Sequence, residues 1–322
     1  MGFVSFIYGK LFIHRYDDNG YIKYFTAADF PGLQAEPVSF KSGGNVLRGF
    51  FYGYPGARAD TLIVFCHGIG GGHRSYMAEI DRICRAGYPV LAYDNTGCFA
   101  SEGDTIGSMS RSLADLDSAL KYLKAEGVFQ KYNNVYCIGH SWGGFAVGNI
   151  PRFHPDIPKI VVISGFLSVE GLLSASLANA RVPAEQGLIK KVMAFEQAAA
   201  PDYWNAYLPD AVKLGTAKYL FAQSSDDAMV PFAPNTGLLQ TLCPEQTFLV
   251  YVDRGHNPNY TADAVNYMQQ TFGRFHKLNR AGRLPTLEKK RAFFADTDWR
   301  RMTAQDEDFW TRVFEFWDGG ER

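Results

Sequence analysis

Cysteine is scarce in this sequence, and neither charge is in excess. The 322 residues include five cysteines, an odd number, and no C-x-x-C pair. This pattern argues against a disulfide framework and a cysteine-ligated metal site, and it indicates small core residues in a reducing, cytoplasmic compartment. With 32 basic and 33 acidic residues the formal net charge is −1, so the composition predicts no binding surface for nucleic acid.

Targeting signals and nucleotide motifs are absent as well. Residues 1–13 are apolar and aromatic, but they lack a basic start and a cleavage site, and they are too short to span a bilayer. We expect no integral membrane segment here, but a segment that packs on the domain or on a partner; peripheral membrane contact is the alternative. The sequence contains no G-x-x-x-x-G-K-[ST] motif and no G-x-G-x-x-G after a predicted strand, so no cofactor is expected.

What the sequence does contain is a regular alternation of apolar runs and amphipathic segments. Residues 61–66 (TLIVFC) form a continuous apolar run, typical of a strand covered on both faces, whereas residues 46–52 alternate like an antiparallel strand. Strands separated by helices predict an α/β fold with a mostly parallel sheet. Further strands are predicted at 89–93, 135–139, 160–164, 219–223 and 248–252, and helices at 75–86 and 110–125.

One glycine-rich turn carries the clearest chemical signal. Residues 133–144 (NNVYCIGHSWGG) read as a strand, then G-x-S-x-G, then the start of a helix. After a buried strand this pattern describes a sharp turn that exposes a serine oxygen above the sheet. Gly139 and Gly143 allow the strain and the close approach of neighbouring backbone, and Ser141 is the candidate nucleophile. The alternative is a strand–helix turn that contains a buried serine.

A serine hydroxyl is a poor nucleophile and needs a base to take its proton. His256 is the best candidate among the seven histidines, because it lies after Gly255 in the loop that follows the last predicted strand. His67, Ser141 and Asp227 also follow the ends of predicted strands. Since ligands of parallel sheets bind beyond the carboxyl ends of the strands, these side chains are expected at one edge.

Five motifs, in this order, resemble the α/β-hydrolase superfamily: HGIGGG at 67–72, DNTGCFASEG at 94–103, GHSWGG at 139–144, DDAMVP at 226–231 and GHN at 255–257. The resemblance covers about residues 38–276. It is greatest to the serine-hydrolase branch that includes lysophospholipase-like and carboxylesterase-like enzymes and serine aminopeptidases. It implies an eight-stranded twisted sheet with helices on both faces and a small helical cap.

The resemblance also implies roles for individual residues. Asp227 precedes Pro231 by the D-x-x-x-P spacing common in this superfamily, so it is expected to orient His256; Asp226 is the rival acid. The chain order Ser, Asp, His is the order of this fold. Two backbone N–H groups are expected to bind the oxyanion, one from Ile69 and one from Trp142.

The resemblance also implies a domain organisation. Residues 1–37 are expected to form an N-terminal extension, residues 38–166 and 215–322 the hydrolase core with a C-terminal helical tail, and residues 167–214 a helical cap, since this insertion is too long for a loop. The cap is expected to place an apolar pocket over Ser141, with Phe166, Met229 and Trp204 in contact with the substrate.

The tail after residue 270 is unusually basic. We interpret residues 273–291 as a connector and residues 303–317 as an amphipathic helix docked on the sheet. A homodimer contact is the alternative role for this tail.

These observations predict a cofactor-free serine hydrolase that cleaves small-molecule carboxylic esters through an acyl-enzyme intermediate. An aminopeptidase or amide hydrolase of the same fold is an alternative, since Glu170, Glu185 and Glu196 of the expected cap could bind a substrate amine. An acyltransferase of this fold, or a non-catalytic binding protein built on it, would also be compatible with these motifs, because fold alone does not determine function.

Overall fold

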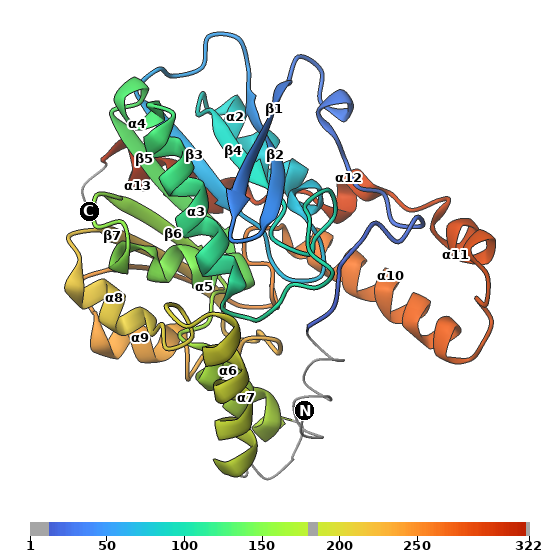
Figure 1. Ribbon diagram of the computed structural model, residues 1–322. Coiled ribbons are helices and arrows are strands. Elements are labelled where there is room, and N and C mark those ends of the chain that lie inside the picture. The colour runs from blue at the N-terminus through green and yellow to red at the C-terminus, as the bar shows by residue number, and fades with distance from the viewer. Residues whose placement is uncertain (1–12, 180–185, 320–322) are drawn as a thin grey trace.

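A single eight-stranded sheet forms the centre of the computed structural model, which describes residues 13–179 and 186–319 (Figure 1). The strand order is β1-β2-β4-β3-β5-β6-β7-β8. β2 pairs antiparallel with both β1 and β4, and the remaining neighbours pair parallel, so the predicted mostly parallel sheet is confirmed. The strands are β1 (Gln34–Ser42), β2 (Asn45–Gly53), β3 (Thr61–Cys66), β4 (Val90–Tyr93), β5 (Asn134–His140), β6 (Lys159–Ile163), β7 (Lys218–Ser224) and β8 (Thr247–Tyr251).

The central strands are buried on both faces, as the apolar run at 61–66 predicts. Leu62, Val64 and Cys66 of β3 belong to the apolar cluster on one face of the sheet. Ile63 and Phe65 of the same strand belong to the cluster on the other face. Because side chains alternate across a strand, one continuous apolar segment serves both layers of the core.

Helices cover the two faces of the sheet unequally. One layer holds α3 (Arg111–Ala125), α5 (Trp142–Asn149), α8 (Leu208–Leu214) and α9 (Thr236–Leu242). The other layer holds α2 (Met77–Arg85) and α13 (Glu307–Asp318). The shorter helices are η1 (Ala27–Asp29), η2 (His73–Tyr76), α4 (Val128–Lys131), η3 (Ile150–Arg152) and α12 (Trp299–Met302).

Two helical pairs extend from this body (Figure 1). α6 (Val169–Asn179) and α7 (Gln186–Ala199) lie within the insertion between β6 and β7, where the sequence predicts a cap. α10 (Ala262–Arg280) and α11 (Leu287–Phe294) form an arm on another side of the molecule. Across the described ranges, none of the helices combines the length and the apolar character needed to cross a bilayer.

The basic tail is more helical than the sequence pattern predicts. Residues 273–280 continue α10 and residues 287–291 lie in α11, so this stretch is not a simple connector. Apolar residues explain the difference, because Phe275, Leu284 and Phe294 are buried in an apolar cluster of their own. The closing helix starts at 307 instead of 303, since the Asp306 carboxylate accepts the Phe309 N–H at 3.0 Å and caps it there.

Candidate active site

The turn after β5 holds Ser141 in a strained backbone conformation. Ser141 has φ 56° and ψ −112°, a region that non-glycine residues rarely adopt. A Cβ on Gly139 would lie 2.4 Å from the Gly143 carbonyl oxygen, and a Cβ on Gly143 would lie 2.1 Å from that of Cys66. The prediction that backbone passes close to both glycines is therefore confirmed. Such strain is typical of functional turns.

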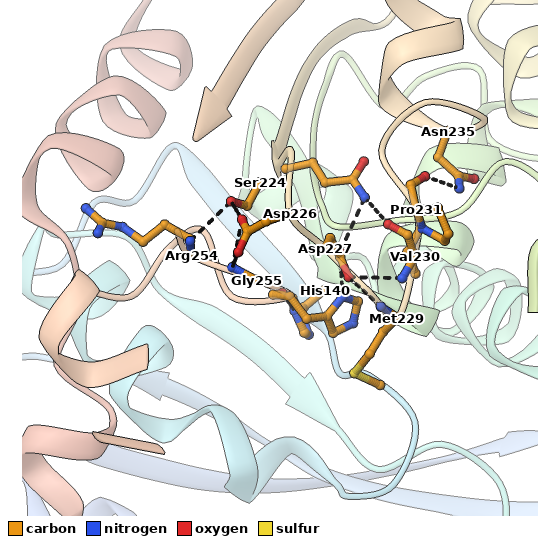
Figure 2. A network of polar contacts seen from close by, with 12 residues as sticks. His140, Ser224, Asp226, Asp227, Met229, Val230, Pro231, Asn235, Arg254 and Gly255 are labelled. Atoms are coloured by element: carbon orange, nitrogen blue, oxygen red, sulfur yellow. Dashed lines mark hydrogen bonds and ion pairs between the residues drawn. The ribbon is translucent and has the colours of Figure 1, made fainter. Parts of the chain in front are cut away.

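The acid loop after β7 is built around the carboxylate of Asp227 (Figure 2). One oxygen of Asp227 accepts the N–H groups of Met229 at 2.9 Å and Val230 at 3.0 Å. The other oxygen lies 2.7 Å from Nδ1 of His256 and 3.3 Å from the side-chain nitrogen of Gln223. The Asp227 side chain is fully buried, so this carboxylate is held in one orientation toward His256.

Asp226, the rival acid, has a different environment. Its carboxylate accepts the Gly255 N–H at 3.2 Å and the Ser224 hydroxyl (Figure 2). These contacts tie the end of β7 to the loop that carries His256. The structure thus brings Asp227, and not Asp226, to the imidazole.

The second ring nitrogen of His256 has a different environment from Nδ1. Nε2 is buried and has no hydrogen-bond partner among the described residues. Since Nδ1 faces a carboxylate, Nδ1 carries the proton and Nε2 is the basic nitrogen. A buried basic nitrogen that lacks a protein partner is suited to take a proton from a hydroxyl that reacts beside it.

A cavity of about 110 Å³ lies at Ser141 and is mostly apolar. It brings together Ser141, both expected oxyanion donors, and two of the three residues expected to contact substrate. Trp142 is the first residue of α5, so its N–H has no acceptor within the helix. The lining residues are Ile69, Met109, Ser141, Trp142, Phe166, Val169, Leu172, Leu173, Ser176, Met229 and Val230.

Trp204 does not line this cavity. It lies in the turn after α7, where its N–H donates to the Ala200 carbonyl at 3.0 Å, and its ring packs against the core. Position within the insertion is a poor guide, because the way in which the helices and turns of the insertion pack decides which of its residues face the cavity. On α6 the lining residues recur at helical spacing: Val169, Leu172, Leu173 and Ser176.

The two remaining glycine-rich loops are held by buried polar contacts. His67 is buried and its Nε2 accepts the Asn95 N–H at 2.9 Å. Asp94 accepts the backbone N–H of His73 at 2.8 Å and that of Ala100 at 3.1 Å. Burial raises the pKa of Asp94, but the neighbouring His73 outweighs burial and the pKa stays below its usual value. These contacts shape the two loops.

Sequence reasoning missed some residues that matter here. Met109 lines the cavity, and its carbonyl accepts the Trp142 indole N–H at 2.5 Å. Gln223 contacts Asp227 from the end of β7. Tyr76 contacts both Gly68 and His140. A polar residue at the end of an apolar strand was a usable signal for Gln223, whereas the other two lie in segments without a distinctive pattern.

A nucleophile turn, an acid–imidazole pair and an apolar cavity at the carboxyl edge of a mostly parallel sheet together define a hydrolase-type site. The chain matches the model of the alpha/beta hydrolase family over residues 63–297, and it belongs to that family. Among the described residues no cluster of His, Cys, Asp and Glu is suited to hold a metal ion.

The chain is also similar to known proteins at low identity. The chain is 31% identical over 111 residues to protein ABHD8 of Bos taurus and to that of Homo sapiens, which covers 34% of this chain and about a quarter of those proteins. Esterase Pf2001 of Pyrococcus furiosus superposes with a TM-score of 0.57 at 15% identity, over 84% of this chain and 97% of the esterase. Est1E of Butyrivibrio proteoclasticus, solved with ferulic acid, gives 0.53 at 14% identity, over 76% and 99%.

Proposed function

We propose that this protein is a serine hydrolase that cleaves carboxylic esters with a small apolar acyl group through an acyl-enzyme intermediate. The observation that carries the proposal is the pairing of His256 with the buried Asp227 at 2.7 Å. Met229 and Val230, whose N–H groups bind Asp227, line the cavity that contains Ser141. The esterases among the structural neighbours agree with an ester substrate, although at their low identity they are evidence for the fold alone.

In this mechanism the Ser141 oxygen attacks the ester carbonyl while Nε2 of His256 takes its proton. Asp227 keeps the imidazole oriented and stabilises the imidazolium that forms. The N–H groups of Ile69 and Trp142 bind the oxyanion, and each such donor contributes about 3 kcal/mol to transition-state stabilisation. His256 then protonates the leaving alkoxide, and water releases the acid by the same steps.

The cavity favours a small apolar acyl group. Its volume of about 110 Å³ is below the roughly 150 Å³ of an apolar cavity that holds benzene. Two polar side chains, Ser141 and Ser176, lie among its lining residues, and the others are apolar. Hydrophobic burial would therefore supply most of the acyl-group affinity, at about 0.8 kcal/mol per methylene.

The aminopeptidase alternative loses support from the cap. Glu196 is buried and its carboxylate already accepts the N–H groups of Met109 at 2.9 Å and Ser110 at 3.0 Å. Glu170 is exposed on α6, and Glu185 lies outside the described residues. Among the acidic residues of the described cap, Glu196 is the one buried near the cavity, and its carboxylate is already hydrogen-bonded within the protein. This favours an ester substrate over one with a free amine.

A fluorophosphonate probe tests the proposal directly. We expect the probe to label the native protein and the protein to hydrolyse p-nitrophenyl butyrate, and we expect Ser141→Ala to lose both properties. Ser118→Ala is the matched control, because that hydroxyl contacts only the Ala114 carbonyl on α3 in the described structure. Folded native protein that is not labelled, or equal labelling of Ser141→Ala, would contradict the proposed function.

A further inference from the structure

Three loops must be held together for the proposed reaction, and they come from distant parts of the chain. The oxyanion loop follows β3, the nucleophile turn follows β5, and the His256 loop follows β8. One chain of hydrogen bonds joins all three. The Gly68 N–H donates to the Tyr76 hydroxyl at 3.0 Å, this hydroxyl lies 2.9 Å from Nδ1 of His140, and Nε2 of His140 lies 2.8 Å from the His256 carbonyl oxygen.

The donor and the acceptor of each of these hydrogen bonds can be assigned. Burial lowers the pKa of His140 to about 3, with a further contribution from His256, so the ring is neutral. The His256 carbonyl can only accept, so Nε2 of His140 carries the proton. Nδ1 of His140 is then an acceptor and receives the Tyr76 hydroxyl proton. The Tyr76 oxygen in turn accepts the Gly68 N–H.

The packing leaves little freedom for this arrangement. A Cβ on Gly68 would lie 2.5 Å from the Tyr76 hydroxyl oxygen and 3.3 Å from Nδ1 of His140, so a larger residue would separate the partners. The rings of His140 and His256 meet edge to face with their centres 4.7 Å apart. His140 itself is buried. The contacts therefore fix the loops relative to one another and are shielded from water.

We propose that Tyr76 and His140 are positioning residues for catalysis, which together set the distance between the base, the nucleophile and the oxyanion loop. The inference rests on the proposed function. His140 precedes Ser141 in the chain, Gly68 precedes Ile69, and His256 is held by its own carbonyl. We call this chain of hydrogen bonds from Gly68 through Tyr76 and His140 to His256 the bridge. A displacement along the bridge moves three groups that must act on one substrate carbonyl, and small misplacements lower the rate strongly.

Steady-state kinetics of bridge variants test this inference. We expect Tyr76→Phe and His140→Ala to lower kcat for p-nitrophenyl butyrate tenfold to a hundredfold with little change in KM, and to slow fluorophosphonate labelling to the same extent. His140→Gln, whose amide can still donate to the His256 carbonyl, is expected to recover part of the loss. The apparent pKa on the acidic side of the kcat/KM profile is expected to move in the slow variants, because the base is displaced.

Tyr88→Phe is the matched control, since it removes a hydroxyl that donates to Asp318 far from the site. A merely structural role of Tyr76 would give Tyr76→Phe and Tyr88→Phe the same small effect on rate and the same change in melting temperature. Bridge variants within twofold of the native kcat, with an unchanged pH profile, would overturn the inference while leaving the proposed function intact. Native protein without labelling would remove the proposed function instead.

Discussion

At the scale of single residues, the neighbouring carboxylates of Asp226 and Asp227 have different roles because they form different hydrogen bonds. Asp227 lies next to Asp226 in the chain, but one faces the His256 imidazole and the other faces the Gly255 N–H. The Asp227 carboxylate also accepts two backbone N–H groups of its own loop, so its position is fixed before any substrate arrives. This pre-arrangement is what a base-orienting acid needs.

Because the two carboxylates have different roles, we expect the same substitution to have different effects at Asp227 and at Asp226. We expect Asp227→Asn to lower kcat by about a thousandfold or more, because an amide at this place favours the wrong imidazole tautomer and does not stabilise the imidazolium. We expect Asp226→Asn to retain activity within about tenfold and to lower the melting temperature, since it weakens the tie between β7 and the His256 loop. Equal losses of kcat in the two variants would show that the acids are not distinguished in this way.

At the scale of elements, a buried carboxylate of the cap is hydrogen-bonded to the core. Glu196 of α7 accepts two N–H groups and the Ser110 hydroxyl immediately before α3. A carboxylate at this place also interacts favourably with the positive end of the helix. The Met109 that it holds lines the cavity and accepts the Trp142 indole N–H. The cap therefore supports the candidate oxyanion residue through two successive hydrogen bonds.

Removing the Glu196 carboxylate is expected to destabilise the protein and to slow ester hydrolysis. Glu196→Ala leaves buried N–H groups without their acceptor, which costs about 2 kcal/mol or more in the free energy of unfolding. Urea denaturation measures that loss, and the kcat of ester hydrolysis should fall with it as Met109 loses its support. Glu170→Ala removes an exposed carboxylate from the neighbouring cap helix and should change neither quantity. A Glu196→Ala variant as stable as the native protein would refute the role of this contact.

Elements were predictable where burial leaves a local pattern. The interior strands appear in the sequence as apolar runs, so their ends could be predicted to within one residue. β1 carries Glu36, Pro37 and Lys41 at an edge of the sheet and is largely exposed over its first half, so no apolar run marked its bounds. Trp204 was misplaced for a related reason, since it lies in the turn after α7 and local sequence does not indicate which cap residues face the cavity.

At the scale of the whole molecule, the sequence predicted which loops meet but not how they are held. The meeting follows from topology, because parallel strands end at the same edge. The bridge through Tyr76 and His140 joins residues 64 and 116 positions apart in the chain, and such contacts have no local signature. The same is true of Glu79 on α2. Its carboxylate accepts a hydrogen bond at 3.2 Å from the side-chain amide of Asn259, which lies three residues after His256 in the sequence. The same carboxylate also contacts Tyr260 and Gln305.

Glu79 thus links α2, the His256 loop and the C-terminal segment, and its ionisation should make the stability of the whole molecule depend on pH. Burial raises the pKa of Glu79 from 4.5 to about 7. The folded protein therefore keeps a proton that the unfolded chain has lost between these values. The free energy of unfolding must then fall as the pH rises through this window, by about 3 kcal/mol at most.

Glu79→Gln isolates this effect, because the amide resembles the protonated carboxyl and does not titrate. Below pH 4.5 the variant and the native protein are expected to have similar stability, and above pH 7 the variant is expected to be the more stable. Differential scanning calorimetry from pH 4 to 8 measures the difference, and contributions from other titrating groups cancel in it. Glu126→Gln, at an exposed position after α3, should follow the native curve. Parallel curves for Glu79→Gln and native protein would mean that Glu79 is ionised in the folded state at ordinary pH, and that its contacts, rather than a retained proton, compensate for its burial.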